Sequence, residues 1–196
     1  MLRRPKALCE VLARLVACAL LVGFFLAAVP TFAHDHDEGW PHAHVFTLRS
    51  PPLEANPVMP DRFTCQDADI SPALSWHDPP ELTKSFVLIM EDPDAPGETW
   101  VHWVVYNLPS GARELPEGVA VEPELADGTL QGANDFGGIG YGGPCPPPGA
   151  LHRYVFRLYA LDAVLPLPAG ATKAQVLQAM TGHATARAEL IGRYQR

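Results

Sequence analysis

The sequence predicts a mainly β protein with little helix. Runs of β-branched and aromatic residues recur along the chain, and each run has the length of a strand. The connections between them are crowded with the chain's 21 prolines and 16 glycines, which favour turns and oppose helices. Helical spacing of apolar residues is confined to residues 171–196. Together these observations favour an antiparallel sheet domain with helical elements on one side.

Residues 1–33 predict an export signal. Three basic residues lie among the first six positions, the apolar run 15–29 follows, and Thr31 and Ala33 fit the small-residue positions of a cleavage site. The apolar run is shorter than the ~20 residues that a membrane-spanning helix needs, and a polar segment follows it. We therefore expect a cleaved signal peptide rather than an anchor, and a periplasmic or secreted protein.

A lipoprotein signal is the alternative for this segment. The residues LVAC at 15–18 resemble such a signal, which would acylate Cys18. A lipoprotein needs a polar tether after that cysteine, whereas mostly apolar residues follow here. The pattern favours the cleaved signal.

The charge balance excludes two classes of partner. The formal net charge of the whole chain is −8, and loss of residues 1–33 removes four basic residues and one acidic residue, which brings it to −11. Nucleic acids and anionic membranes both require basic surface. We expect no partner of either class, and cleavage of the signal leaves no stable membrane anchor.

A histidine-rich segment, residues 34–44, precedes the predicted domain 45–196. Its histidines alternate with acidic residues, and neutral imidazole is a common ligand of copper, zinc and nickel. Two interpretations stay open, a metal-binding segment and a flexible polar tail. The histidines concerned are His34, His36, His42 and His44.

Two cysteines remain after loss of the signal, Cys65 and Cys145. An even number of cysteines in an exported protein predicts a disulfide between them. The alternative is a pair of buried free thiols.

The predicted strands account for most of the domain. The longest gap between them, 109–151, has no clear period, so we expect it to contain a short strand at 127–132 or to be ordered by a function. The predicted strands are VFTLRS (45–50), ALSWH (73–77), SFVLIMED (85–92), TWVHWVVYNL (99–108) and HRYVFRLYALDA (152–163).

Residues 171–196 predict helix. Thr172 and Gln175 have the spacing of a capping box, and Gly182 marks a break between two helices. The apolar residues at roughly helical intervals are Val176, Leu177, Met180, Ala184 and Ile191.

Two segments carry the residues with chemical potential. In the first, the turn DPDAPG at 92–97 leads into a strand with His102. In the second, the glycine- and proline-rich segment 137–149 leads into a strand that starts with His152 and Tyr154. Positions i and i+2 of a strand point to the same side, so His152 and Tyr154 can face one cavity.

These segments resemble the phosphatidylethanolamine-binding protein family, in its bacterial Raf kinase inhibitor-like branch. Weaker similarity extends over CQDADISPALSW (65–76) and LQGANDFGGIGYGG (130–143). The branch typically has glycine where this chain has Asp67, and glycine permits backbone angles that aspartate disfavours, so the loop 65–70 departs from the pattern. The main matching pieces are DPDAP (92–96), WVHW (100–103), GYGGPCPPPG (140–149) and HRYVFRLYALD (152–162).

The resemblance implies a large central antiparallel sheet packed on a smaller sheet, with C-terminal helices. It also implies a small pocket for an anion such as phosphate or a phosphoryl head group, with a glycine–proline wall. It implies no cofactor, and its association with protease inhibition makes a protease one expected partner. The residues expected at the pocket are Asp92, His102, His152 and Tyr154, with Gly143 and Pro144 in the wall.

Elementary chemistry suggests how such a pocket would work. Backbone N–H groups beside the glycines would donate to the anion, and the prolines would keep the loop stiff. The histidines and Tyr154 would add donors, and Asp92 would accept a hydrogen bond from a histidine N–H. Anion affinity is then expected to fall as pH rises through roughly 6–8, the titration range of a carboxylate-paired imidazole.

Three functional hypotheses follow. The first is an exported binding protein for a small anionic or phosphorylated ligand. The second is a hydrolase that uses the same residues for acid–base chemistry on an ester or phosphoester, although the chain has no G-x-S-x-G or H-E-x-x-H motif. The third is an exported domain whose pocket has no ligand. The sequence favours the first and predicts no enzyme.

Overall fold

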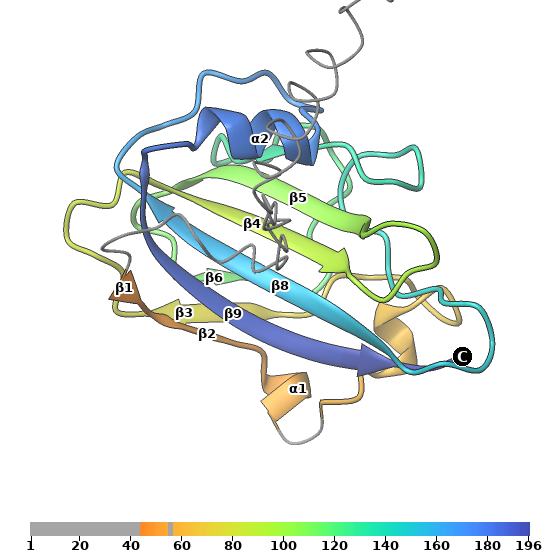
Figure 1. The fold of residues 1–196 in the computed structure, drawn as a ribbon. Coiled ribbons are helices and arrows are strands. Elements are labelled where there is room, and N and C mark those ends of the chain that lie inside the picture. Colours follow the sequence, from red (N-terminus) through yellow and green to blue (C-terminus); the bar gives the residue numbers. More distant parts are fainter. Residues whose placement is uncertain (1–43, 55–56) are drawn as a thin grey trace, which may run out of the picture. The chain divides into compact units, whose positions relative to one another are not determined.

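The computed structural model describes residues 44–54 and 57–196. The predicted signal peptide and the histidines at 34, 36 and 42 lie outside the described residues, whereas His44 begins the first strand. Figure 1 shows the fold. Its elements are β1 (His44–Val45), β2 (Thr47–Arg49), α1 (Pro51–Glu54), the 3-10 helix η1 (Asp61–Phe63), β3 (Leu74–His77), β4 (Ser85–Asp92), β5 (Trp100–Pro109), β6 (Glu114–Leu115), β7 (Leu130–Gln131), β8 (His152–Leu161), α2 (Lys173–Ala179) and β9 (Ala184–Tyr194).

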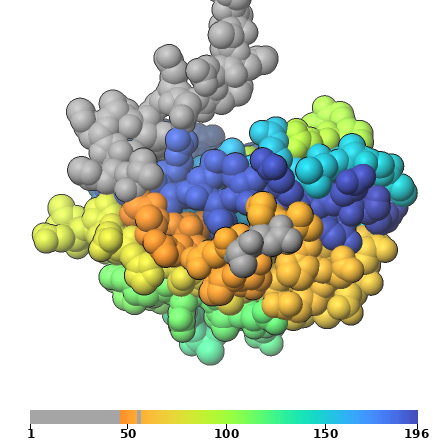
Figure 2. All heavy atoms as spheres, turned by 90° about the horizontal axis from the view of Figure 1, so that it is seen from below, coloured from red at the N-terminus to blue at the C-terminus, as the bar shows by residue number. Residues whose placement is uncertain are grey.

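The described strands form two sheets. The larger has the order β1-β9-β8-β4-β5-β7, and the smaller has the order β2-β3-β6. Their pairs are antiparallel except for β1 with β9, which is parallel. On the side seen in Figure 2, the orange residues of β1 and β2 border the blue residues of β9. The fold is therefore mainly β with a large and a small sheet, as the sequence predicts.

The large sheet is covered on both faces. Phe86, Leu88 and Met90 of β4 face a core shared with the smaller sheet, and the alternate residues Val87 and Ile89 face a core covered by α2. This explains why β4 is an unbroken apolar run, since every one of its residues is buried. The same alternation in β8 places Tyr154, Phe156 and Leu158 in the core between the sheets.

The sequence locates the strands of the core well. The strand predicted at 85–92 is β4, and those predicted at 99–108 and 152–163 are β5 and β8. The short strand expected near 127–132 is present as β7. Long strands buried on both faces carry the strongest sequence signal, because aromatic and β-branched residues fit such sheets.

The predicted helix after Gly182 is wrong. α2 begins after Thr172 with the predicted capping box to Gln175, but the chain turns at Gly182, where φ is +80°, and continues as β9. β9 pairs with β8 along nearly its whole length. Its buried face consists mainly of alanine and glycine, so the two-residue alternation is weak in the sequence and the alanines read as helix.

The predicted disulfide between Cys65 and Cys145 is present. It joins the loop after η1 to the glycine- and proline-rich segment, and Gly143 lies against that loop. A Cβ on Gly143 would lie 2.4 Å from the Phe63 carbonyl oxygen and 2.9 Å from the Thr64 Cα, so only glycine fits this approach. Within the described part of the chain, no helix is long and apolar enough to cross a membrane.

Candidate functional site

A cavity of about 310 Å³ lies where β4 ends and where β5 and β8 begin. The antiparallel pairing brings these three strand ends together, because Asp92 pairs with Trp100, and Glu91 pairs with Val155. The cavity is lined by Asp92, Ala95, Pro96, Trp100, His102, Phe136, Cys145, Pro146, Pro147, His152 and Tyr154.

Four of the predicted site residues meet in this pocket, although they come from three strands. Asp92, His102, His152 and Tyr154 all line it, and each is at most 4% exposed. The other two, Gly143 and Pro144, do not line it; both are buried beside the disulfide. The wall is formed instead by the next three residues, 145–147.

His152 and Asp92 form a buried pair. The His152 Nδ1 and the Asp92 Oδ2 are 2.7 Å apart, and both side chains are almost fully buried. A carboxylate can only accept here, so the imidazole donates from Nδ1 and its Nε2 is left for another partner. This is the aspartate–histidine hydrogen bond that the sequence predicts.

His102 occupies a β-bulge in β5. Met90 pairs with Trp103, and Glu91 pairs with Val101, so His102 is the extra residue, and such bulges redirect side chains. Its Nδ1 lies 2.6 Å from the Gly142 carbonyl oxygen, which only accepts, so Nδ1 carries the proton. Burial lowers the pKa of His102 below its usual 6.5, although Gly142 and Asp92 oppose this shift. At neutral pH the ring is neutral and Nε2 has a free lone pair.

Two further donors at the pocket have no hydrogen-bond partner among the described residues. They are the hydroxyl of Tyr154, which lies near the Asp92 carboxylate, and the indole N–H of Trp100. Burial, and secondarily the negative charge of Asp92, raises the pKa of Tyr154, so its hydroxyl stays protonated. Buried polar groups normally have partners, and unpaired donors at a cavity indicate where a ligand would supply an acceptor.

Aromatic rings surround His102. Its ring makes edge-to-face contacts with Phe136 at 5.3 Å and with Tyr154 at 5.1 Å between centroids, and Phe136 also contacts Trp100 at 5.6 Å. Phe136 is half exposed and lies at the mouth of the pocket. The sequence analysis does not predict Trp100 or Phe136 at the pocket. Trp100 could have been found, because it lies two residues before His102 in the same strand and such positions point to one side.

The predicted role of the glycines is wrong. Their backbone N–H groups donate to acceptors within the protein and are therefore not available to an anion. The Gly142 N–H donates to the His102 carbonyl at 3.0 Å, and the Gly143 N–H donates to Asp69 Oδ1 at 2.7 Å. The N–H groups of Gly137, Gly138 and Gly140 likewise donate to residues of the same region. The N–H groups of these glycines therefore hold the segment in place.

The departure from the family pattern at Asp67 has no backbone cost. The described residue of this loop with a left-handed backbone is Asp69, at φ 53°, and not Asp67. Aspartate tolerates that conformation better than most residues. Asp69 also accepts the Gly143 N–H, so it is a residue of this loop with a defined contact that sequence reasoning missed.

Comparison with known proteins identifies the family. The family model described as phosphatidylethanolamine-binding protein matches residues 49–195. The chain belongs to the phosphatidylethanolamine-binding protein family.

Relatives in this family cover most of the described domain. A UPF0098 protein of Methanothermobacter thermautotrophicus is 53% identical over 138 residues, which are 70% of this chain and 91% of the relative. A UPF0098 protein of Aquifex aeolicus is 53% identical over 140 residues, 70% of this chain and 81% of the relative.

Solved structures of the family share the fold. A putative phosphatidylethanolamine-binding protein homologue of Chlamydia trachomatis has a TM-score of 0.71 and 43% identity, over 79% of this chain and 99% of that one. Escherichia coli YbcL, described as a new member of the mammalian phosphatidylethanolamine-binding protein family, has a TM-score of 0.70 and 33% identity. The match covers 77% of this chain and 98% of that chain.

The second acid of the DPDAP motif, a signature of the resemblance to this family, has a structural role. The Asp94 carboxylate accepts from Arg153 Nε at 2.8 Å, from Nη2 at 2.7 Å and from the Arg153 backbone N–H at 2.9 Å. The hydrogen bond to the Arg153 side chain lowers the pKa of Asp94 to about 2. The pair ties the turn with Ala95 and Pro96 to the start of β8, which keeps these residues at the pocket.

No metal site is found among the described residues. They contain no group of three or more histidine, cysteine, aspartate or glutamate side chains that could hold a metal ion. The predicted metal ligands at 34, 36 and 42 lie outside the described residues, so that hypothesis stays a prediction.

Proposed function

We propose that this family member is an exported binding protein whose pocket takes a small anionic group, such as phosphate or a phosphoryl head group. The observation that carries the proposal is the set of buried groups at the pocket with unused donor capacity. These are the Tyr154 hydroxyl and the Trp100 indole N–H, and His102 Nε2 joins them once its ring is protonated.

The oxygens of Asp92 accept hydrogen bonds from within the protein. Its Oδ2 accepts from His152, and its Oδ1 accepts from the Asp94 backbone N–H at 2.8 Å. The carboxylate is therefore satisfied by two donors within the protein. Through Nδ1 it fixes the tautomer of His152, so a proton on this ring's Nε2 would point away from Asp92 toward another acceptor.

The pocket exceeds the size of a single phosphate. Its volume of about 310 Å³ lies at the lower end of the range for small-molecule sites. The polar residues are the most buried, whereas Phe136, Pro96 and Pro147 are exposed at the mouth. This gradient supports a ligand whose anionic group lies deepest and whose remaining part contacts the apolar mouth.

The pH dependence of affinity follows from His102. Its pKa is lowered, so the ring becomes a donor at Nε2 only when the pH falls below its usual 6.5. Affinity for sulfate, which stays fully ionised over this range, should rise as the pH falls from 7 to 5. The range of roughly 6–8 expected from the sequence for a carboxylate-paired ring stays a prediction, because His102 is paired with a carbonyl oxygen.

A titration with inorganic phosphate tests the proposal. Ring signals of His102 and His152 should shift with added phosphate, whereas His183, half exposed and paired with Asp162 at 2.8 Å outside the pocket, should not. Tyr154→Phe removes one donor and should weaken binding about fivefold or more, with the fold retained. If no ring signal responds at millimolar phosphate, the anion site is refuted.

Export is supported by the chemistry of the cysteines. Disulfides persist in oxidising compartments and are rare in reducing ones, and Cys65 and Cys145 are bonded here. Together with the signal-like sequence of residues 1–33 this supports a periplasmic or secreted protein. N-terminal sequencing of protein recovered from the exported fraction tests the proposal, since cleavage should leave His34 at the N-terminus.

The alternative function is hydrolysis. The Asp92–His152 hydrogen bond is the arrangement that orients a histidine as a general base, and Tyr154 could act as an acid. However, the pocket has no serine or threonine in its lining, and Cys145 is held in the disulfide. We therefore favour binding without catalysis. Turnover of phosphate or carboxyl esters that is lost in His152→Ala would establish the alternative.

A further inference from the structure

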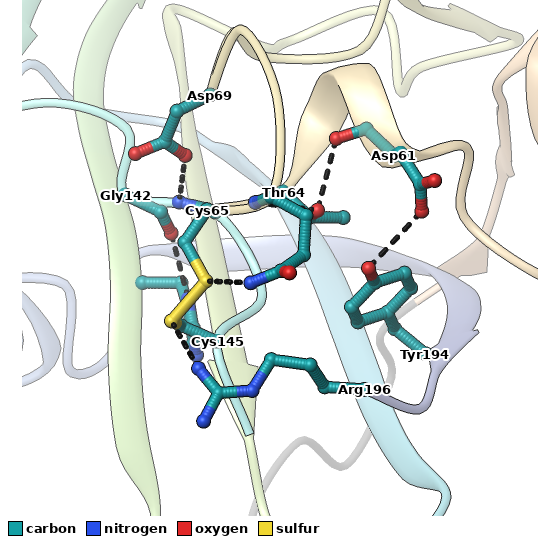
Figure 3. The surroundings of a disulfide bond; sticks show 11 residues. Asp61, Thr64, Cys65, Asp69, Gly142, Cys145, Tyr194 and Arg196 are labelled. Atoms are coloured by element: carbon teal, nitrogen blue, oxygen red, sulfur yellow. Dashed lines mark hydrogen bonds between the residues drawn. A yellow bond between two sulfur atoms is a disulfide. The ribbon is translucent and has the colours of Figure 1, made fainter. Parts of the chain in front are cut away.

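The disulfide forms part of the pocket wall. Cys145 lines the cavity together with Pro146 and Pro147, and its partner Cys65 lies on the loop after η1. Figure 3 shows the bond between the two loops, with Asp69 to one side and Arg196 to the other. Apart from its own backbone, the wall of the pocket is thus linked covalently to the loop after η1 by this disulfide.

The residues before Cys145 are held by several other contacts. The Tyr141 hydroxyl donates to the Phe63 carbonyl at 2.6 Å, and the Gly143 N–H donates to Asp69. The Cys65 N–H donates to the Pro144 carbonyl at 3.2 Å. These contacts would keep residues 141–144 in place without the disulfide.

The residues after Cys145 are held by much less. Within the described chain, Pro146, Pro147 and Pro148 make no hydrogen bond, and the next contacts are those of Gly149 with Gln195 and Arg196. Prolines keep the local backbone stiff but do not fix where the segment lies. Between the contacts of Pro144 and Gly149, the stretch 145–147 is therefore held by the disulfide and by the packing of the buried Pro146.

The disulfide is also suited to exchange. Both cysteines are partly exposed, and the side-chain contacts of both sulfur atoms lie at the exposed surface. The Arg196 guanidinium lies 3.6 Å from Cys145 Sγ, and the Gln66 side-chain amide lies 3.6 Å from Cys65 Sγ. A cation beside a sulfur stabilises its thiolate, and a stabilised thiolate leaves faster in exchange.

We propose that the Cys65–Cys145 disulfide is a thiol-exchange site that controls the anion pocket: a dithiol reductant opens the bond, the wall at 145–147 loosens, and affinity for the anion falls while the fold remains. The proposal rests on the proposed function, because the anion is the ligand that the wall helps to hold. The partner it implies is a dithiol oxidoreductase or a small dithiol.

The exchange is balanced by the dithiol. One of its thiolates attacks Cys65 Sγ, the bond to Cys145 breaks, and Cys145 leaves as a thiolate beside Arg196. The second thiol of the reductant, as its thiolate, then attacks the mixed disulfide and releases Cys65. The protein gains two electrons and two protons, and the reductant becomes a disulfide.

The experiment compares phosphate binding by the oxidised and the dithiothreitol-reduced protein. We expect the dissociation constant for phosphate to rise about tenfold on reduction, because the ligand must then order the wall residues. The far-UV circular dichroism should be unchanged, and the ring signals of His102 and His152 should shift on reduction even without phosphate. Equal affinities in the two states would overturn the proposal, and so would cooperative unfolding on reduction.

Two further measurements separate the parts of the proposal. Arg196→Gln keeps the disulfide, so phosphate affinity of its oxidised form should be unchanged, whereas its reduction by dithiothreitol should slow about two- to fourfold. An unchanged rate would refute the role of Arg196. If the oxidised protein bound no phosphate while its ring signals still moved on reduction, the anion function would fail and the link between disulfide and pocket would stand.

Discussion

The floor and the wall of the pocket are built in different ways. The floor consists of the ends of β4, β5 and β8, and its side chains are fixed by strand pairing and by hydrogen bonds between buried groups. The wall at 145–147 has almost no hydrogen bonds and is positioned by one disulfide and by the packing of the buried Pro146. The floor is thus part of the paired strands of the core, whereas the wall is a loop segment cross-linked to the domain by the disulfide.

The difference suggests a pocket whose polar residues are fixed by the sheet and whose wall is less firmly held. The groups that would contact an anion belong to strands whose loss would unfold the sheet. The proposed thiol exchange would move the segment that closes the cavity without disturbing those strands. Four variants test this division, because each removes one of the contacts that hold the floor, the wall or the segments beside them.

Removal of the disulfide should have the largest effect on stability. Cys65→Ser with Cys145→Ser opens a loop with a sequence separation of 80 residues, and the chain-entropy model gives about 4 kcal/mol for the free energy of unfolding. The floor should survive, because the roughly 5–15 kcal/mol typical of the unfolding of a domain exceeds this loss. Chemical denaturation measures the loss, and a change below about 1 kcal/mol would contradict the entropic account.

Gly143→Ala should have the next largest effect and lower the free energy of unfolding by about 3 kcal/mol. Its Cβ would meet the Phe63 carbonyl and Asp69 Oδ1, each at 2.4 Å, and the backbone of the two loops would have to separate. Gly111→Ala is the matched control, since a Cβ there would meet no atom beyond its chain neighbours within 4 Å and its backbone is not left-handed. Thermal melts of both variants compare them, and equal melting temperatures would disprove the contact.

Asp92→Ala should lower the free energy of unfolding by about 2 kcal/mol. The substitution leaves the Nδ1–H of the buried His152 without an acceptor, and it frees the Asp94 N–H. The control is Asp162→Ala, which removes the acceptor of the exposed His183 and should change the stability by less than about 0.5 kcal/mol. Similar losses of stability in both variants would show that burial does not make the Asp92–His152 pair more stabilising than the exposed Asp162–His183 pair.

Asp94→Asn should have the smallest effect, about 1 kcal/mol or less, because the pair with Arg153 is largely exposed. The folded-state pKa of Asp94, about 2, lies below its usual 3.8. The stability from this pair is therefore present above pH 3.8 and is lost as the pH falls toward 2. Denaturation at pH 7 and at pH 2 should show a difference between wild type and variant only at pH 7.

Sequence reasoning was accurate where burial and strand pairing decide the structure. The strand runs of β4, β5 and β8 follow from their apolar and aromatic content, and the pocket residues at their ends follow from the motifs around Asp92, His102 and His152. The strand β9 was misread as helix because alanine favours helix and conceals the alternation. Pairing with β8 overrides that local preference.

The wall was harder to predict because its contacts are tertiary. Nothing local to Gly143 indicates that its N–H donates to Asp69, which lies 74 residues earlier in the chain. Nor does the spacing in β5 reveal that His102 is a bulge residue, since that depends on its register with β4. Glycine-rich composition predicts an unusual backbone, but not whether its N–H groups face a ligand or the protein.

The disulfide closes a covalent ring that contains β3 to β7 and leaves β8, α2 and β9 outside it. The ring includes the exposed stretch 121–124, where Val121 is 65% exposed. A protease that cuts the chain once in this stretch would therefore release no fragment. The two halves should migrate as one band on a gel without reductant and as two bands with it, which makes limited proteolysis a simple reporter of the state of the bond.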